Sequence, residues 1–256
     1  MEEIKSEIEL KAVLNKSSGV IIAGELHHQL KGMLGKKLIY DMVKNNDVSP
    51  DQITIFLEGI PHNPEELIKV RPRLEDGPDA QTLIWHDRLK QYGFNILGLE
   101  TNRTRADLYL SKNEMLKEII NKNPGYSEVL DTDSSLGDIM EIYRREIIQP
   151  SRVKDLDSTA SKIISEQHSE SKCSLVVVGY DHTPGMKTLI EKTGIEIKTL
   201  GFEQSSKSSD KFDIKYAGTV LDNTSDWSST SNIFPFWEKT KTDFKSMAQE
   251  SHCVIL

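Results

Sequence analysis

The run CSLVVVGYDH, residues 173–182, carries the clearest strand signal in the chain and ends on titratable side chains. Its unbroken apolar centre is typical of a strand buried on both faces of a parallel sheet. Three similar runs are GVIIAGE (19–25), ITIFLEG (53–59) and FNILGLE (94–100). Helical patterns lie between these strands. The sequence therefore predicts an α/β fold with a mainly parallel central sheet flanked by helices.

Helices are predicted in the remaining segments of the first 202 residues, at 1–16, 29–46, 80–92, 151–169 and 184–194, with a mostly helical stretch at 103–150. Residues 60–79 hold four prolines, which predicts a loop with a short helical turn that covers the strand ends as a lid. Residues 195–202 and 211–220 are predicted as edge strands.

The chain is expected to divide at residue 202. Residues 1–202 would form a hydrolase-like α/β catalytic domain, and residues 203–256 an edge strand, a polar linker and a C-terminal tail. The second part is rich in Ser, Thr, Asn and Asp, which is typical of a linker.

The composition narrows the possible partners and compartments. A net charge of -8 and the lack of a Lys/Arg run exclude nucleic acid as a partner. Two cysteines form neither a disulfide framework nor a metal motif, which indicates a reducing compartment. No secretory signal and no apolar run near ~18 residues is evident, so a cytosolic chain is expected.

Polar residues gather where the predicted strands end. In an open parallel sheet, ligands bind beyond the carboxyl ends of the strands. Because neighbouring parallel strands end at the same edge, we expect these side chains to converge. The candidate catalytic residues are Glu25, His27, His28, Glu58 and His182. The supporting candidates are Glu100, Arg103 and Asp181.

These residue types suit the activation of water. A histidine can take a proton from water near neutral pH, and a carboxylate fixes its tautomer. A second histidine from another strand can stabilise an oxyanion or protonate a leaving group. Residues 179–185 are not a nucleophile elbow, and Cys173 opens its strand at the wrong end, so direct attack by water is favoured.

Two points stay open from the residues alone. In an extended strand Glu25 shares a face with His27, whereas in a helix it neighbours His28. The same group could also hold a divalent metal, through His27, His28, His182 and Glu58.

The motifs GELHH (24–28), FLEG (56–59) and GYDH (179–182) resemble a superfamily signature. The superfamily includes erythromycin esterases, ChaN-like haem-uptake proteins, Tiki proteases and the Ras-cleaving domains of bacterial toxins. The resemblance spans residues 17–200. It implies that Glu25, His27 or His28, Glu58 and His182 form the active centre. Its esterases and toxin peptidases require no metal, Tiki proteases use one and ChaN-like proteins bind haem iron, so the resemblance implies a site and not a substrate.

The last four residues of the sequence, from Cys253, fit the C-a-a-X pattern, and the final leucine favours geranylgeranyl. We therefore expect prenylation of Cys253 and location at the cytoplasmic face of a host membrane. Prenyl transfer is eukaryotic chemistry, whereas the resembling branches are largely bacterial. Together these features predict a bacterial effector or toxin that acts inside a host cell.

The leading hypothesis is a hydrolase of ester or peptide bonds that requires no cofactor. Its substrate would be a membrane-bound host protein, with a small GTPase as one candidate. An alternative from another class is a binding module that holds haem or a metal, or a catalytically inactive scaffold of the same fold. A purely structural α/β domain is the third hypothesis.

Overall fold

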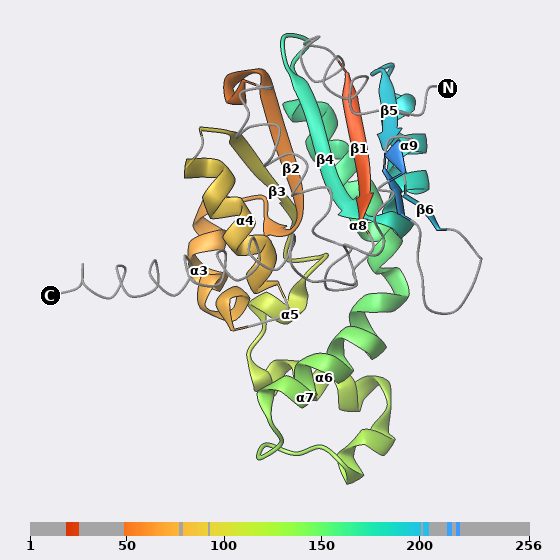
Figure 1. Cartoon of the computed structure of the whole chain (residues 1–256). Helices are drawn as coiled ribbons and strands as arrows, with labels where there is room; N and C mark the ends of the chain where they lie inside the picture. Colours follow the sequence, from red (N-terminus) through yellow and green to blue (C-terminus); the bar gives the residue numbers. More distant parts are fainter. Residues whose placement is uncertain are drawn as a thin grey trace, which may run out of the picture.

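The computed structural model (Figure 1) describes residues 19–25, 49–76, 79–91, 93–200, 202–204, 214–216 and 219–220. Several predicted features lie outside the described residues. They are the helices at 1–16 and 29–46, His27, His28, and most of residues 203–256 with Cys253.

The described residues form a five-stranded sheet in which every neighbouring pair of strands is parallel, in the order β3-β2-β4-β1-β5. This confirms the predicted α/β fold. The strands are β1 (Val20–Glu25), β2 (Ile53–Pro61), β3 (Asn95–Glu100), β4 (Cys173–Gly179) and β5 (Ile197–Leu200). The most strand-like run of the sequence, β4, takes the central position, and all seven of its residues are buried.

Helices α8 (Gln149–Gln167) and α9 (Thr183–Glu191) pack on the sheet (Figure 1). Ile22, Phe56 and Val176 of the strands meet Leu156 of α8 and Met186 of α9 in one apolar core. Burial of such side chains contributes about 1.5–3 kcal/mol each. Helix α4 (Ala80–Gln91) packs against β2 and β3.

The prediction of a loop at residues 60–79 is wrong, because most of this segment is helix α3 (Pro64–Glu75). Asn63 caps the helix by accepting a hydrogen bond from the Glu65 N–H at 2.9 Å. Proline at the first helical position is compatible with a helix because its missing N–H has no partner there in any case. Two hydrogen bonds of 2.8 and 2.9 Å from Arg71 to Asp87 then join α3 to α4.

A helical region follows β3 and has an apolar core of its own (Figure 1, lower end). It comprises α5 (Ala106–Tyr109), α6 (Lys112–Lys122), η3 (Pro124–Glu128), α7 (Leu136–Tyr143) and the π-helix η4 (Arg144–Ile148), which leads directly into α8. We call its buried core the helical cluster: Met115, Leu116, Ile119, Leu130, Ile139, Tyr143 and Ile148.

Three short strands form a second, antiparallel sheet: β6 (Phe202–Gln204), β7 (Ile214–Tyr216) and β8 (Thr219–Val220). Strand β5 lies at an edge of the main sheet as predicted, whereas the predicted edge strand at 211–220 pairs within this second sheet. The described residues contain no helix with the length and apolar character that a membrane crossing requires.

Candidate active site

An irregularity near the end of β2 places Glu58. The register between β2 and β3 shifts between Leu57 and Pro61. Gly59 within it has φ +83°, a left-handed conformation that favours glycine. A Cβ on Gly98 of β3 would lie 2.2 Å from the carbonyl oxygens of Ile60 and Pro61, so only glycine permits this approach. Such irregularities re-aim side chains at the ends of strands.

The carboxylate of Glu58 joins three elements at this edge of the sheet. Its Oε2 accepts a hydrogen bond from the Gly179 N–H at the end of β4 (2.6 Å). Its Oε1 accepts one from the Arg152 guanidinium of α8 (2.8 Å). Both hydrogen bonds hold the carboxylate between β4 and α8.

Glu100, at the end of β3, forms the buried part of the same network. Its side chain is fully buried and accepts hydrogen bonds from Arg152 at 2.8 and 3.3 Å and from the Gly59 N–H at 3.1 Å. Arg152 also donates to the Thr104 carbonyl at 2.9 Å. Burial alone would lower the pKa of Arg152, but Glu100 and Glu58 outweigh it and raise that pKa. Arg152 therefore remains charged between the two carboxylates.

His182 follows β4 and lies between two carboxylates. Its Nδ1 is 2.8 Å from Asp157 Oδ1, and its Nε2 is 3.6 Å from Glu58 Oε1. Burial lowers the pKa of His182, but the interactions with Asp157 and Glu58 outweigh it and raise the pKa to about 9. His182 is therefore an imidazolium at neutral pH, with a proton on each ring nitrogen.

The backbone around His182 explains how Asp157 reaches it. The short helix η5 (Tyr180–His182) follows β4 directly and leads into α9. A Cβ added to Gly185 of α9 would lie 1.9 Å from Asp157 Oδ2. The lack of a side chain at Gly185 thus lets α8 and α9 approach closely enough for the Asp157–His182 hydrogen bond.

The structure brings together part of the predicted site. Glu58 and His182 are in contact, Glu100 joins them through Arg152, and Glu25 ends β1 with its Cα paired to Gly179. His27 and His28 lie outside the described residues. The other supporting candidates are exposed. Arg103 pairs with Asp155 on the surface at 2.8 Å, and Asp181 is an exposed residue.

Two members of the site on α8, Arg152 and Asp157, were not predicted from the sequence. A signal for them exists, because they lie at helical spacing with the buried residues Leu156, Ala160 and Ile164. A charged residue within an apolar stripe indicates a buried polar contact. We call Glu58, Glu100, Arg152, Asp157 and His182 the charged cluster.

A cavity of about 330 Å³ opens beside Glu58 and Arg152. A second ion-pair network lines it, in which buried Asp107 accepts hydrogen bonds from Arg105 at 3.0 and 3.2 Å and from Arg144 at 2.6 Å. Arg105 also donates to Asp79 at 2.6 Å. Burial would raise the pKa of Asp107, but the two arginines outweigh it and lower that pKa.

Of the four residues predicted as possible metal ligands, Glu58 and His182 meet, and the two histidines of the first strand lie outside the described part. Among the described residues, no group of three or more His, Cys, Asp and Glu side chains is arranged to hold a metal ion. The carboxylates of the charged cluster pair with Arg152 and His182.

Comparisons with models of protein families, with curated proteins and with solved structures found no match.

Proposed function

We propose that this chain is a hydrolase of ester or peptide bonds that uses Glu58 and His182 with water as the nucleophile. The observation that carries the proposal is the position of His182. It lies at the carboxyl end of a central parallel strand, with Nδ1 held by Asp157 and Nε2 directed at Glu58. A histidine oriented by one carboxylate beside a second is an arrangement suited to general acid–base catalysis.

The charge of His182 assigns its role in the proposal. An imidazolium is a proton donor, so His182 is the general acid and another group must be the base. The sequence offers His27 or His28 after β1 for that role. Glu58 accepts hydrogen bonds from Arg152 and the Gly179 N–H, and its role is to stabilise the positive charge of His182.

The proposed reaction balances in protons. The oxygen of water bonds to the carbonyl carbon while the first-strand histidine takes a proton from that water. The bond from carbon to the leaving oxygen or nitrogen then breaks, and that atom receives the Nε2 proton of His182. Transfer of the first proton to His182 restores the starting state.

Glu58→Gln and His182→Ala test the proposal. Activity would be measured on chromogenic esters, on a peptide mixture and on cell lysate that contains small GTPases, with new termini identified by mass spectrometry. Each variant should lose about 10²–10⁴-fold in rate. Asp181→Asn is the matched control, because Asp181 is adjacent in sequence and exposed. Wild-type rates in either variant, or no product from any substrate with the wild type, would overturn the proposal.

Gly185→Ala separates positioning from chemistry. The added methyl group collides with Asp157 and should displace it from Nδ1 of His182. The general acid would then lose its orientation, and its pKa would fall because only Glu58 would still raise it, so the alkaline limb of the pH–rate profile should move to lower pH. An unchanged profile with a displaced Asp157 would remove Asp157 from the mechanism.

We also propose that the substrate is a membrane-bound host protein reached through prenylation of Cys253. This part rests on the sequence pattern alone, since Cys253 lies outside the described residues. Cys253→Ser should move the protein from the membrane fraction to the cytosol of a eukaryotic cell. Membrane association that persists in this variant would contradict it.

A further inference from the structure

Arginine is concentrated around two cavities of this chain. The sequence has 24 lysines and eight arginines. No lysine in the described part of the chain lines either cavity, whereas five arginines do: Arg73, Arg105, Arg144, Arg145 and Arg152. Arginine offers a planar fork of donors that matches a carboxylate, which a lysine ammonium does not. Carboxylates line the same cavities, with Glu58, Asp79 and Asp107 in the smaller one and Asp76 and Glu141 in the larger one. An anionic ligand is therefore recognised only by an arginine whose fork is not already occupied.

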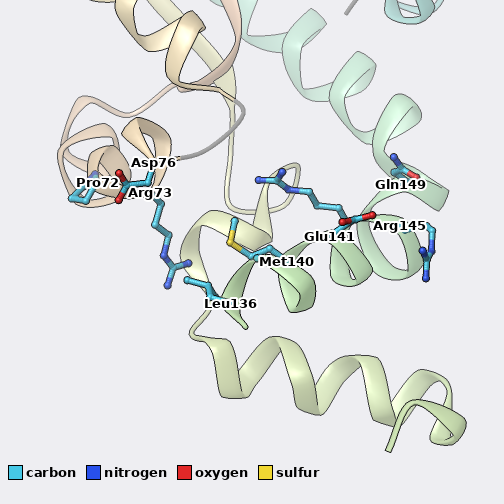
Figure 2. Close-up of a pocket in the computed structure, with 10 residues that line it drawn as sticks. Pro72, Arg73, Asp76, Leu136, Met140, Glu141, Arg145 and Gln149 are labelled. Carbon is cyan, nitrogen blue, oxygen red and sulfur yellow. The ribbon is translucent and has the colours of Figure 1, made fainter. Parts of the chain in front are cut away.

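The two cavities are neighbours. The one of about 330 Å³ contains Glu58, and the other, of about 690 Å³, lies between the end of α3 and α7. Arg144 and Gln149 line both. Figure 2 shows Arg73 extending from α3 toward Leu136 of α7 across the larger cavity. Its volume lies within the range of about 300–1,000 Å³ typical of ligand pockets.

Arg144 differs from the two arginines that share the smaller cavity with it. Arg105 and Arg152 each bind two carboxylates. Arg144 donates only its Nε, to Asp107, and no acceptor within the described residues meets its two terminal nitrogens. Its side chain is 27% exposed. The open end of this guanidinium is therefore available where the two cavities meet.

The π-helix η4 supplies this position. One continuous helical path runs from α7 through η4 into α8, and the wider π-turn changes the direction of the side chains that follow. Ile148, at the end of η4, packs in the helical cluster and also lines the smaller cavity. The π-turn contains an extra residue compared with an α-helical turn. One continuous helical path can therefore bind Asp107 through Arg144 and Glu58 through Arg152.

We infer that Arg144 binds the carboxylate of an Asp or Glu side chain in a polypeptide substrate. This rests on the proposed function, because it assigns the substrate of the same site. Asp107, fully buried and held by Arg105, orients the Arg144 guanidinium through Nε and leaves the fork open. Apolar side chains in the larger cavity, at Pro72, Leu136 and Met140, suit an apolar residue next to the acidic one. A polypeptide can carry an acidic and an apolar side chain on neighbouring residues, whereas a free inorganic anion carries only the charge.

The test uses fluorescein-labelled hexapeptide libraries with one central position fixed as Glu, Gln or phosphoserine and the others randomised. Binding to the full chain would be measured by fluorescence anisotropy. The wild type should bind the Glu library about 10-fold more tightly than the Gln library. Arg144→Gln should abolish this preference, and Arg144→Lys should keep part of it because the charge remains without the fork.

Arg103→Gln is the matched control. Arg103 is exposed, pairs with Asp155 on the surface and lines neither cavity. This variant should keep the preference for Glu. The Arg144→Gln variant should still fold, because Asp107 retains its two hydrogen bonds from Arg105. A melting temperature close to that of the wild type would verify that it is folded.

Equal affinity of the wild type for the Glu and Gln libraries would overturn the inference, as would a preference that survives in Arg144→Gln. Tighter binding of the phosphoserine library than of the Glu library would indicate a phosphate site and overturn the inference that Arg144 binds a carboxylate. Cleavage of the same libraries is scored separately by mass spectrometry. A binding preference for Glu without cleavage would contradict the proposed hydrolase function but support the role of Arg144. Cleavage without a preference for Glu would support the hydrolase function but contradict the role of Arg144.

Discussion

The helical cluster is buried and the charged cluster is largely buried, and they are built from opposite kinds of side chain. The helical cluster consists of apolar residues and Tyr143, in and around helices that are close in sequence. The charged cluster brings together residues from β2, β3, α8 and η5 after β4, and its partners Glu58 and His182 are 124 positions apart in the sequence. One is organised by local sequence and the other by the topology of the sheet.

The difference in composition indicates that the helical cluster stabilises the fold and that the charged cluster has another role. Apolar burial stabilises a fold directly, at roughly 25 cal/mol per Å². A buried ion pair is weak evidence of stabilisation, because removing two charges from water costs about as much as their attraction returns. The charged cluster therefore needs another explanation, and the proposed catalysis at Glu58 and His182 supplies one.

Arg152→Met should have the largest effect on stability. It leaves the fully buried Glu100 without its cation and removes one of the partners of Glu58, which costs about 3–5 kcal/mol of unfolding free energy. Urea denaturation followed by circular dichroism measures it. The double variant Arg152→Met/Glu100→Gln should recover part of the loss. The exposed Arg103→Met should cost no more than about 1 kcal/mol. A similar loss in both single variants would contradict the special role of the buried network.

Ile119→Ala tests the helical cluster. Ile119 is 1% exposed, and its truncation leaves a cavity among apolar neighbours, so a loss of about 2–5 kcal/mol is expected. The control is Ile68→Ala, because Ile68 is 72% exposed on α3 and should change stability by at most about 0.5 kcal/mol. If Ile119→Ala were as mild as the control, this cluster would not contribute as an apolar core.

The strands of the main sheet could be predicted because their signal is local. Four apolar runs became β1, β2, β3 and β4, with ends close to those predicted. Helix α3 is not predicted from the sequence, because four prolines in residues 60–79 favour a loop. Pro64 stands at the helix start beside the cap Asn63, where a proline is favoured. Pro72 lies inside the helix, where a proline is unfavourable, and the helix nevertheless continues to Glu75 with Leu67, Val70 and Leu74 buried.

The site could be predicted only in part, for a related physical reason. Glu58, Glu100 and His182 follow strands, and the topology of a parallel sheet brings such residues together. Arg152 and Asp157 belong to a helix, whose rotation about its axis depends on packing against the sheet. No local sequence pattern predicts which strand end a side chain on a helix will contact.

The stability of the protein should fall as pH rises from about 6.5 to about 9. The pKa of His182 is raised to about 9 in the folded state, against 6.5 for an ordinary histidine. The folded protein thus holds a proton that the unfolded chain releases. This stabilisation is complete below pH 6.5 and is lost as pH rises through 9, up to about 3 kcal/mol in all. Urea denaturation across this range measures it.

Asp157→Asn serves as the comparison for the pH effect. It removes the carboxylate that holds Nδ1, so the pKa of His182, followed by NMR of its imidazole, should fall and the pH dependence should shrink. A wild-type histidine that titrates near 6.5 would show that the charged cluster does not hold an imidazolium. Ile119→Ala, by contrast, should lower stability equally at pH 6.5 and pH 9, because no titratable group is involved.

The smallest expected effect lies at the start of α6. Ser111 and Glu114 form a capping box, in which the Ser111 N–H donates to Glu114 (2.7 Å) and the Glu114 N–H donates to Ser111 (3.3 Å). Ser111→Ala removes the hydroxyl and should cost about 1 kcal/mol. Ser158→Ala, at an exposed interior position of α8, is the control and should be neutral or slightly stabilising.

Ser111→Ala also tests whether the two clusters are independent. Helix α6 contributes Met115 and Ile119 to the helical cluster, so a weakened cap should increase amide hydrogen exchange there. The pKa of His182 should stay at about 9, because its partners lie on α8 and β2. A shift of that pKa in Ser111→Ala would mean that the helical region transmits its packing to the site through η4 and α8.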